Sequence, residues 1–171
     1  MGSERAIRIC FVCLGNICRS PTAEAVMRHL VVRERLEDRI LVESAGTGDW
    51  HVGELRDRRS REVGESRGMP LGGRARHFVA ADFARFDWVV AMDGQNLNTL
   101  RDLAPDEAAS GKIRLLRAFD PASPPGSDVP DPYYGGDEGF ERVFDICLAG
   151  CEGLLAHLAA DLDDELGDEK Q

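Results

Sequence analysis

Short β-rich runs alternate with helical stretches along this 171-residue chain, and this alternation restricts the fold more than any other feature. Apolar and β-branched residues gather in four runs, at 6–12, 40–44, 87–92 and 112–116. After Pro21 the apolar residues recur at helical intervals, and a second helix is expected over 96–103. The stretch 55–86 is expected to hold one helix and a further helical turn. Strands separated by helices predict a parallel sheet with helices on both faces.

A long apolar stripe marks the last helix. From Phe140 to Leu162, apolar residues recur at intervals of three and four, after a proline-rich stretch over 118–132 that predicts an extended loop. We expect a single domain formed by residues 1–160. The acidic segment 161–171 is expected to be a frayed tail.

Charge and hydropathy exclude several classes of protein. With 21 basic and 31 acidic side chains the net charge is −10, so nucleic acid is not an expected partner. No apolar run approaches the roughly 18 residues that span a bilayer, and the first residues lack the apolar core of a signal peptide. We therefore expect a cytoplasmic protein without a membrane partner, as a monomer or weak dimer.

The five cysteines argue against both a disulfide framework and a metal site. Their odd number, without a secretory signal, does not suit paired disulfides. Cys147 and Cys151 lie on the apolar stripe and are expected to be core residues. Cys10 lies inside the first strand, and the four histidines show no ligand spacing, so we expect no metal and no cofactor.

Cys13 opens the run C-L-G-N-I-C-R-S, which joins the end of the first strand to the helix after Pro21. A turn of this kind binds anions, because its backbone N–H groups point inward and the helix dipole adds partial positive charge. Gly15 permits the unusual dihedral angles that this needs, and Asn16 tolerates the left-handed region. The predicted phosphate-binding residues are Leu14, Gly15, Asn16, Ile17, Cys18 and Arg19.

Arg19 and Ser20 complete the chemistry of this loop. The planar guanidinium of Arg19 matches two oxygens of a phosphate dianion. The positive field favours a thiolate at Cys13, and Ser20 is placed both to donate to that sulfur and to cap the helix before Pro21. A nucleophile, an anion cradle and a fixed cation thus come from eight residues.

A cysteine that attacks phosphorus also needs an acid for the leaving oxygen, which contributes roughly 10²–10⁴ in rate. The motif D-P-Y-Y-G-G supplies a candidate, because Pro132 holds Asp131 on a stiff, extended backbone. Tyr133 and Tyr134 are the only tyrosines in the chain, and they are suited to wall a slot for a flat ring.

Together these motifs resemble those of the low-molecular-weight protein tyrosine phosphatases. C-L-G-N-I-C-R-S-P and D-P-Y-Y-G carry the resemblance, and S-A-G-T-G-D-W-H-V-G, F-A-R-F-D-W-V-V-A-M-D and F-D-P extend it over nearly the whole chain. It implies a flavodoxin-like three-layer α/β sandwich, with a four-stranded parallel sheet in the order 2-1-3-4. It also implies hydrolysis of phosphotyrosine proteins and aryl phosphate monoesters, with inorganic phosphate as the product.

The resemblance assigns catalytic roles by position. Cys13 would form a phosphocysteine while Arg19 clamps the equatorial oxygens of the phosphoryl group. Asp131 would act first as the general acid and then as the base toward water. Ser20 would stabilise the departing thiolate.

Other residues would support the loop and line its entrance. Asn16 and Ser44 would brace the loop from behind. Cys18 resembles the family's second cysteine, which traps an oxidised nucleophile as a Cys13–Cys18 disulfide. The entrance, which selects an aryl phosphate, would be lined by Trp50, Tyr133 and Tyr134.

One position departs from the family pattern. Many relatives place a histidine of the bracing network in the segment that matches G-M-P-L-G-G-R-A-R, where this chain has Gly73, and His77 lies four residues further on. The bracing is therefore expected to be looser, or to use water or another side chain, with catalysis retained.

Three alternative functions stay open. Arginine phosphatases of similar sequence carry threonine where Ile17 stands, so Ile17 and the paired tyrosines favour phosphotyrosine. A thiol-dependent arsenate reductase needs further cysteines around the third strand, and none lies between Leu30 and Ile146. An anion-binding or metal-stapled module without turnover would have no use for an acid such as Asp131 beside two aromatic rings.

Overall fold

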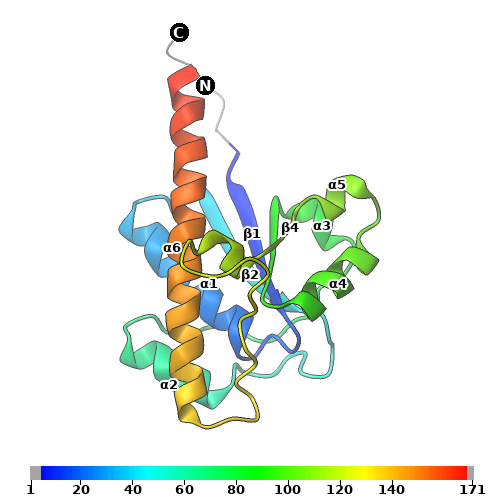
Figure 1. Ribbon diagram of the computed structural model, residues 1–171, viewed down its shortest axis with the longest axis vertical. Coiled ribbons are helices and arrows are strands. Elements are labelled where there is room, and N and C mark those ends of the chain that lie inside the picture. The colour runs from blue at the N-terminus through cyan, green and yellow to red at the C-terminus, as the bar shows by residue number, and fades with distance from the viewer. Residues whose placement is uncertain (1–4, 169–171) are drawn as a thin grey trace.

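The computed structural model describes residues 5–168 and contains a parallel sheet of four strands in the order β2-β1-β3-β4 (Figure 1). The strands are β1 (Ile7–Cys13), β2 (Ile40–Gly46), β3 (Trp88–Ala91) and β4 (Ile113–Leu115). β1 is an inner strand that pairs with β2 on one side and β3 on the other. Parallel strands bring their carboxyl ends to one edge of the sheet, where ligands bind in folds of this type. The predicted α/β fold and strand order are confirmed.

Helices cover both faces of the sheet, which gives the expected three layers. α1 and α6 pack on one face, and α3, α4 and α5 lie on the other (Figure 1). The helices are α1 (Arg19–Arg33), α2 (Arg58–Ser66), α3 (Asp82–Arg85), α4 (Gly94–Leu103), α5 (Glu107–Ser110) and α6 (Asp137–Asp168), with a short 3-10 helix η1 (Leu116–Phe119).

Alternate residues of β1 supply two separate cores. Ile9, Phe11 and Cys13 point toward α1 and α6, whereas Cys10 and Val12 point toward α3 and α4. Because the strand is buried on both faces, it reads in the sequence as a nearly continuous apolar run.

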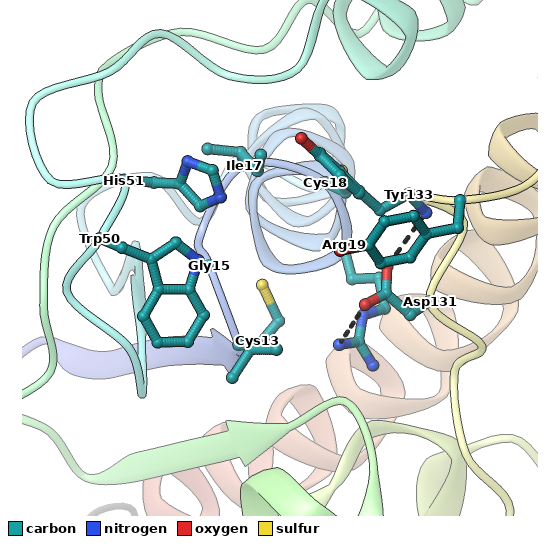
Figure 2. A pocket seen from close by; sticks show the side chains of 11 residues that line it. Cys13, Gly15, Ile17, Cys18, Arg19, Trp50, His51, Asp131 and Tyr133 are labelled. Atoms are coloured by element: carbon teal, nitrogen blue, oxygen red, sulfur yellow. Dashed lines mark hydrogen bonds and ion pairs between the residues drawn. The ribbon is translucent and has the colours of Figure 1, made fainter.

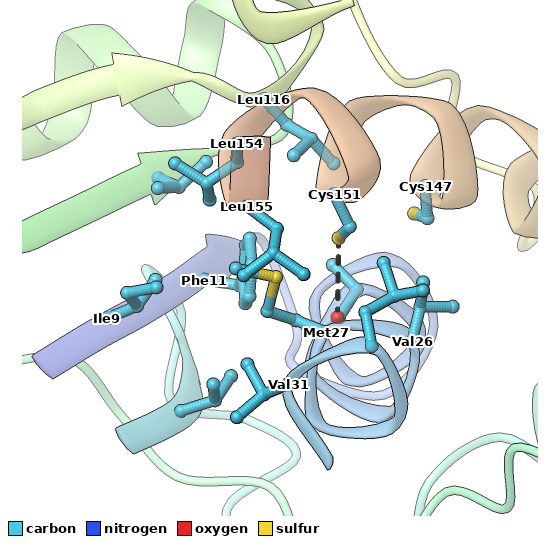
Figure 3. Packing of buried hydrophobic residues seen from close by; sticks show 14 of the residues in the cluster. Ile9, Phe11, Val26, Met27, Val31, Leu116, Cys147, Cys151, Leu154 and Leu155 are labelled. Atoms are coloured by element: carbon cyan, nitrogen blue, oxygen red, sulfur yellow. Dashed lines mark hydrogen bonds between the residues drawn. The ribbon is translucent and has the colours of Figure 1, made fainter. Parts of the chain in front are cut away.

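Cys147 and Cys151 lie in the larger core, as predicted. Both are fully buried on the side of α6 that packs on α1 (Figure 3). The Cys151 thiol donates to the carbonyl oxygen of Ala23 at 3.6 Å, and the Cys147 thiol to that of Arg19 at 3.9 Å. Burial raises the pKa of Cys147 to about 12, so this residue remains a protonated thiol.

The start of α1 differs from the sequence prediction. The helix begins at Arg19 and not at Pro21, and Ser20 does not cap it. The hydroxyl of Ser20 instead lies 3.0 Å from the sulfur of Cys13. A side chain that faces the sulfur is not available to the backbone N–H groups of the first turn.

The acidic segment from residue 161 was expected to be a frayed tail; in the structure, 161–168 continue α6. Leu162 is 5% exposed and belongs to the core on the α1 side, so packing holds the helix beyond residue 160. Residues 169–171 lie outside the described part of the chain. By length and composition alone Asp137–Glu165 could cross a membrane, but its apolar side forms the core against α1 and the sheet.

Candidate active site

The loop that joins the carboxyl end of β1 to α1 wraps around the sulfur of Cys13. Cys13 is 2% exposed. The backbone N–H of Asn16 donates to its Sγ at 3.3 Å, and the Ser20 hydroxyl lies 3.0 Å from the same atom. Donors placed in this way stabilise negative charge on the sulfur.

Asn16 gives the loop its shape. Its φ of 56° lies in the left-handed region, as its residue type suggested. Its side-chain amide donates to the hydroxyls of Ser20 and Ser44, each at 2.9 Å, while its Oδ1 accepts from the backbone N–H of Arg76 at 3.0 Å. Only the backbone of Asn16 therefore faces the sulfur, and its side chain ties the loop to β2 and to the segment before α3.

Gly15 leaves room for the ring of His51 beside the anion loop. Among the residues that the structure describes, Gly15 is not one of the glycines with positive φ. A Cβ at Gly15 would lie 2.9 Å from Cδ2 of His51, and a Cβ at Gly46 would lie 2.8 Å from the carbonyl oxygen of Leu14. These two glycines allow neighbouring segments to approach the anion loop closely.

Arg19 is held by groups from two other segments. Its side chain is 4% exposed, and the guanidinium donates through Nη1 to Asp93 Oδ2 at 2.6 Å and to the carbonyl oxygen of Val129 at 3.1 Å. Nη2 lies 3.7 Å from Oδ2 of Asp131 (Figure 2). Burial acts to lower the pKa of Arg19, but Cys13, Asp93 and Asp131 raise it by more, so the net shift is upward.

Asp93 is a site residue that the sequence analysis missed. It follows β3 and caps α4, because its Oδ1 accepts from the backbone N–H of Asn96 at 2.8 Å while its Oδ2 holds Arg19. The signal was the aspartate in M-D-G, directly after a buried strand, which is a helix-cap residue at the same sheet edge as Cys13.

Asp131 faces Cys13 from the other side of the cavity, on the extended loop that precedes α6 (Figure 2). Its carboxylate is 44% exposed and accepts from the backbone N–H of Tyr133 at 3.1 Å. This local turn keeps the carboxylate directed toward the cavity, near Arg19.

The cavity above the sulfur has a volume of about 290 Å³ and aromatic walls. Trp50 and Tyr134 are 60% and 95% exposed at its entrance. The His51 ring lies 6.2 Å from that of Trp50 and 6.4 Å from that of Tyr133. The residues that line the cavity are Cys13, Leu14, Gly15, Ile17, Cys18, Arg19, Trp50, His51, Asp131, Tyr133 and Tyr134. All predicted phosphate-loop and rim residues are thus brought together except Asn16, whose side chain lies behind the loop.

His51 is a second residue that the sequence analysis missed. Its Nδ1 lies 2.6 Å from Oε2 of Glu54, which fixes the ring beside the cavity. Its position next to Trp50 in D-W-H was the available signal.

Cys18 lies in the wall of the cavity and is 5% exposed. Burial, followed by the negative charges of Asp57 and Cys13, raises the pKa of Cys18 to about 12. It is therefore a protonated thiol beside the proposed nucleophile. Within residues 5–168, no group of three or more His, Cys, Asp or Glu side chains is placed to hold a metal ion.

Arg56 occupies the space beside Gly73, the position at which the family resemblance implied a bracing histidine. Gly73 has a φ of 75°, and a Cβ there would lie 3.4 Å from Nη2 of Arg56. Nη1 of Arg56 donates to the carbonyl oxygen and to Oδ1 of Asn16, both at 2.7 Å. The sequence left open whether the loop is braced more loosely, by water or by another side chain. The structure shows another side chain, that of Arg56.

A buried cysteine ends an inner parallel strand, with the Asn16 N–H and the Ser20 hydroxyl at its sulfur and a fixed guanidinium and a carboxylate beside it. These features define a cysteine-dependent phosphatase. The chain belongs to the low-molecular-weight phosphotyrosine protein phosphatase family, whose family model matches residues 8–164.

Individual relatives include tyrosine phosphatases and one arginine phosphatase. A low molecular weight protein-tyrosine-phosphatase of Streptomyces coelicolor is 51% identical over 150 residues, which cover 87% of this chain and 92% of that protein. The crystal structure of a protein tyrosine phosphatase from Entamoeba histolytica aligns with a TM-score of 0.87 at 42% identity, over 91% of this chain and 99% of the other. A Drosophila arginine phosphatase aligns with a TM-score of 0.80 at 34% identity, over 89% and 98% of the two chains.

Proposed function

We propose that this phosphatase hydrolyses phosphotyrosine and other aryl phosphate monoesters through a phosphocysteine intermediate. The observation that carries the proposal is the Cys13 sulfur, which lies 3.3 Å from the N–H of Asn16 and 3.0 Å from the Ser20 hydroxyl in a cavity with aromatic walls. Arg19 and Asp131 border the same cavity. A nucleophile, an anion cradle, a cation and an acid therefore meet in one place.

Binding of the substrate places its phosphate in the anion loop. The non-bridging oxygens accept from the backbone N–H groups of residues 14–19 and from the guanidinium of Arg19. Because Asp93 already orients that guanidinium, little reorganisation accompanies the reaction. The aryl ring lies between Trp50 and Tyr133.

In the first step the Cys13 thiolate attacks phosphorus, and the bond from phosphorus to the aryl oxygen breaks. Asp131 gives its proton to that oxygen, so a neutral phenol leaves. Arg19 and the loop amides stabilise the charge on the equatorial oxygens in a loose transition state.

In the second step a water molecule attacks the phosphocysteine while Asp131, now a carboxylate, takes a proton from it. The phosphorus–sulfur bond breaks and its electron pair returns to Cys13, where the Ser20 hydroxyl and the Asn16 N–H stabilise the thiolate. Inorganic phosphate leaves, and Asp131 keeps the proton for the next cycle.

Turnover of p-nitrophenyl phosphate tests this function. The purified protein should hydrolyse it in the presence of a chelator, and vanadate or inorganic phosphate should block the reaction. Cys13→Ser should abolish turnover because an unactivated hydroxyl replaces the sulfur nucleophile. Full activity in that variant would contradict the proposal.

The substrate class is tested with matched peptides that carry phosphotyrosine, phosphoserine or phosphoarginine. The aromatic walls suit a flat ring, and Ile17 offers no hydroxyl to a guanidinium group, so kcat/KM should be highest for phosphotyrosine. A preference for phosphoarginine would contradict the proposed substrate class and would match the activity in the name of the Drosophila structural relative.

Cys18 is proposed to protect Cys13 from irreversible oxidation. Peroxide oxidises the Cys13 thiolate to a sulfenic acid and releases hydroxide, after which the Cys18 thiol forms a disulfide with it and water leaves. Mass spectrometry after peroxide should find the Cys13–Cys18 disulfide. Only sulfinic or sulfonic Cys13 would exclude this role.

A further inference from the structure

Arg56 lies behind the anion loop, outside the group of residues that line the cavity. It is 5% exposed, and a charged side chain this deeply buried normally has specific partners. Its Nη1 donates to both the carbonyl oxygen and Oδ1 of Asn16 at 2.7 Å, and its Nε donates to the carbonyl oxygen of Gly72 at 3.1 Å. The guanidinium thus joins the loop to a segment more than 50 residues away.

We propose that Arg56 is a positioning residue for this phosphatase, which holds Asn16 in its left-handed conformation and so directs the loop amides at the Cys13 sulfur. The inference rests on the proposed function of the site. A positive φ is unfavourable for residues other than glycine, less so for asparagine, and surrounding contacts help to keep Asn16 in it. Two charge-assisted hydrogen bonds to the main chain and side chain of Asn16 supply that constraint.

Gly73 and Glu24 make the arrangement possible. A Cβ at Gly73 would lie 3.4 Å from Nη2 of Arg56, so the guanidinium packs directly against this glycine, and the φ of 75° disfavours a larger residue there. Glu24 of α1 is 7% exposed, and its Oε2 lies 4.0 Å from Nη2, which places a counter-charge behind the loop. Together they allow a full cation to be buried at this position.

The charge of Arg56 does not depend on pH in the working range. Burial lowers the pKa of Arg56, whereas Glu24 and Cys13 act to raise it. The pKa of an arginine starts far above the working range of pH, so the group remains protonated despite such a shift. The support that it gives to Asn16 is therefore constant wherever the enzyme is stable.

The first experiment compares Arg56→Met, Arg56→Lys and the control Arg58→Met. Arg58 is a neighbouring arginine that pairs with Glu62 on the surface of α2. We expect Arg56→Met to lower kcat about tenfold to hundredfold, because a displacement of catalytic groups by about 1 Å reduces the rate by up to this factor. The variant should also bind inorganic phosphate more weakly, as measured by calorimetry. Arg58→Met should match the wild type in both measurements.

Arg56→Lys separates positioning from a general effect on folding. The guanidinium of Arg56 also lies 3.5 Å from the Ser44 hydroxyl through Nη2. An ammonium group donates from one atom and cannot bond Asn16 and Gly72 together as the guanidinium fork does, so recovery should be partial. A buried lysine also loses its proton at a lower pH than arginine. The ratio of Arg56→Lys activity to wild-type activity should therefore fall as the pH rises, and a ratio that stays flat would count against the proposal.

A double-mutant cycle tests whether Arg56 acts through Asn16. In an Asn16→Ala background, Arg56→Met should cost much less than in the wild type, because the contact is already lost. Additive losses, or wild-type kcat and phosphate affinity in Arg56→Met, would overturn the proposal. Melting curves verify folding, and Arg56→Lys carries the comparison if Arg56→Met does not fold.

The two proposals fail in different ways. The binding of inorganic phosphate can be measured without turnover. This measurement therefore tests the role of Arg56 even if the enzyme acts on another substrate. Cys13→Ser tests the function itself and leaves all contacts of Arg56 in place.

Discussion

Ser20 stands in the first turn of α1 and gives its hydroxyl to the active-site sulfur. A serine at the start of a helix usually accepts from a backbone N–H. Here its Oγ accepts from the side-chain amide of Asn16 at 2.9 Å and lies 3.0 Å from Cys13 Sγ and 3.4 Å from the carbonyl oxygen of Ala45. Its proton can therefore go to either acceptor, and a thiolate at the shorter distance is the stronger one. α1 has no side-chain cap at this end, and the thiolate gains a donor.

Ser20→Ala should slow the second chemical step more than the first, because the thiolate is the leaving group only there. By analogy with the loss of one oxyanion donor, we expect kcat to fall by about 10²-fold. Rapid-mixing experiments with p-nitrophenyl phosphate should then show a burst of p-nitrophenol followed by slow turnover. A slow first turnover without a burst would contradict this role for Ser20.

Asp131→Asn should affect aryl phosphates according to their leaving groups. The amide cannot donate an acidic proton, so esters of weakly acidic phenols should lose more kcat/KM than esters of nitrophenols. The measurement is kcat/KM across a series of substituted phenyl phosphates. Asp128→Asn is the control. Asp128 lies on the same loop as Asp131 but does not line the cavity, and its carboxylate accepts from the backbone N–H of Gly94 at the start of α4. Equal losses for all esters would remove Asp131 as the acid.

At the scale of elements, the start of α2 is fixed by Asp57. Its Oδ1 accepts from the backbone N–H of Arg59 at 2.8 Å, and its carboxylate pairs with the Arg59 guanidinium at 3.1 Å. Burial acts to raise the pKa of Asp57, but the hydrogen bonds from Arg59 lower it by more. The cap is therefore strongest when the carboxylate is charged.

The stability that Asp57 contributes should depend on pH in a defined direction. Its pKa is lower in the folded protein than in the unfolded chain, where an aspartate titrates near 3.9. Its contribution is thus complete above about pH 4 to 5 and is lost as the pH falls through the folded-state pKa. Asp57→Ala should cost about 1 kcal/mol near pH 7 and less at low pH, measured by urea unfolding. Asp57→Asn keeps a capping oxygen that does not titrate, so it serves as the control. If the loss of unfolding free energy in Asp57→Ala were independent of pH, the argument would be contradicted.

Gly153 allows α6 to approach η1 closely. A Cβ at this position would lie 1.9 Å from the carbonyl oxygen of Phe119, so the helix or the 3-10 turn would have to move. Gly153→Ala should lower the free energy of unfolding by about 1–3 kcal/mol, as other overpacked cores do. Gly167→Ala on the same helix meets no atom within 4 Å and should leave stability unchanged or slightly higher. Equal stability of the two variants in urea would contradict this packing argument.

The strands and the long helices could be predicted because their apolar patterns are local. α5 was missed because its four residues are too short to show a period. Within the site, Cys13 and Arg19 follow from a contiguous loop, and Asp131 from a motif with a stiff backbone. Arg56 reaches the loop from 40 residues away. Such contacts depend on where the whole chain packs, which no local pattern contains.

For the whole molecule, anion binding should be coupled to stability. Inorganic phosphate that binds only the folded state at 100 times its Kd adds about 2.7 kcal/mol. For a chain of this size that corresponds to a rise of roughly 5–10 °C in Tm. Arg19→Lys loses the planar fork and should show a smaller rise at the same phosphate concentration. Equal rises measured by scanning calorimetry would place the bound phosphate outside this loop.

The net charge of −10 would be expected to repel a phosphorylated substrate, but the length of α6 keeps part of this charge far from the anion loop. α6 begins beside the anion loop, where Phe140 packs with Ile17 and Cys18, and ends at the opposite end of the molecule (Figure 1). From Asp137 to Asp163 the helix rises about 39 Å, whereas at physiological ionic strength the field of an exposed charge decays over about 8 Å. Dissolved ions therefore screen the acidic end of the helix from an incoming dianion, which meets the local field of Arg19, the loop amides and the nearby carboxylates of Asp93 and Asp131.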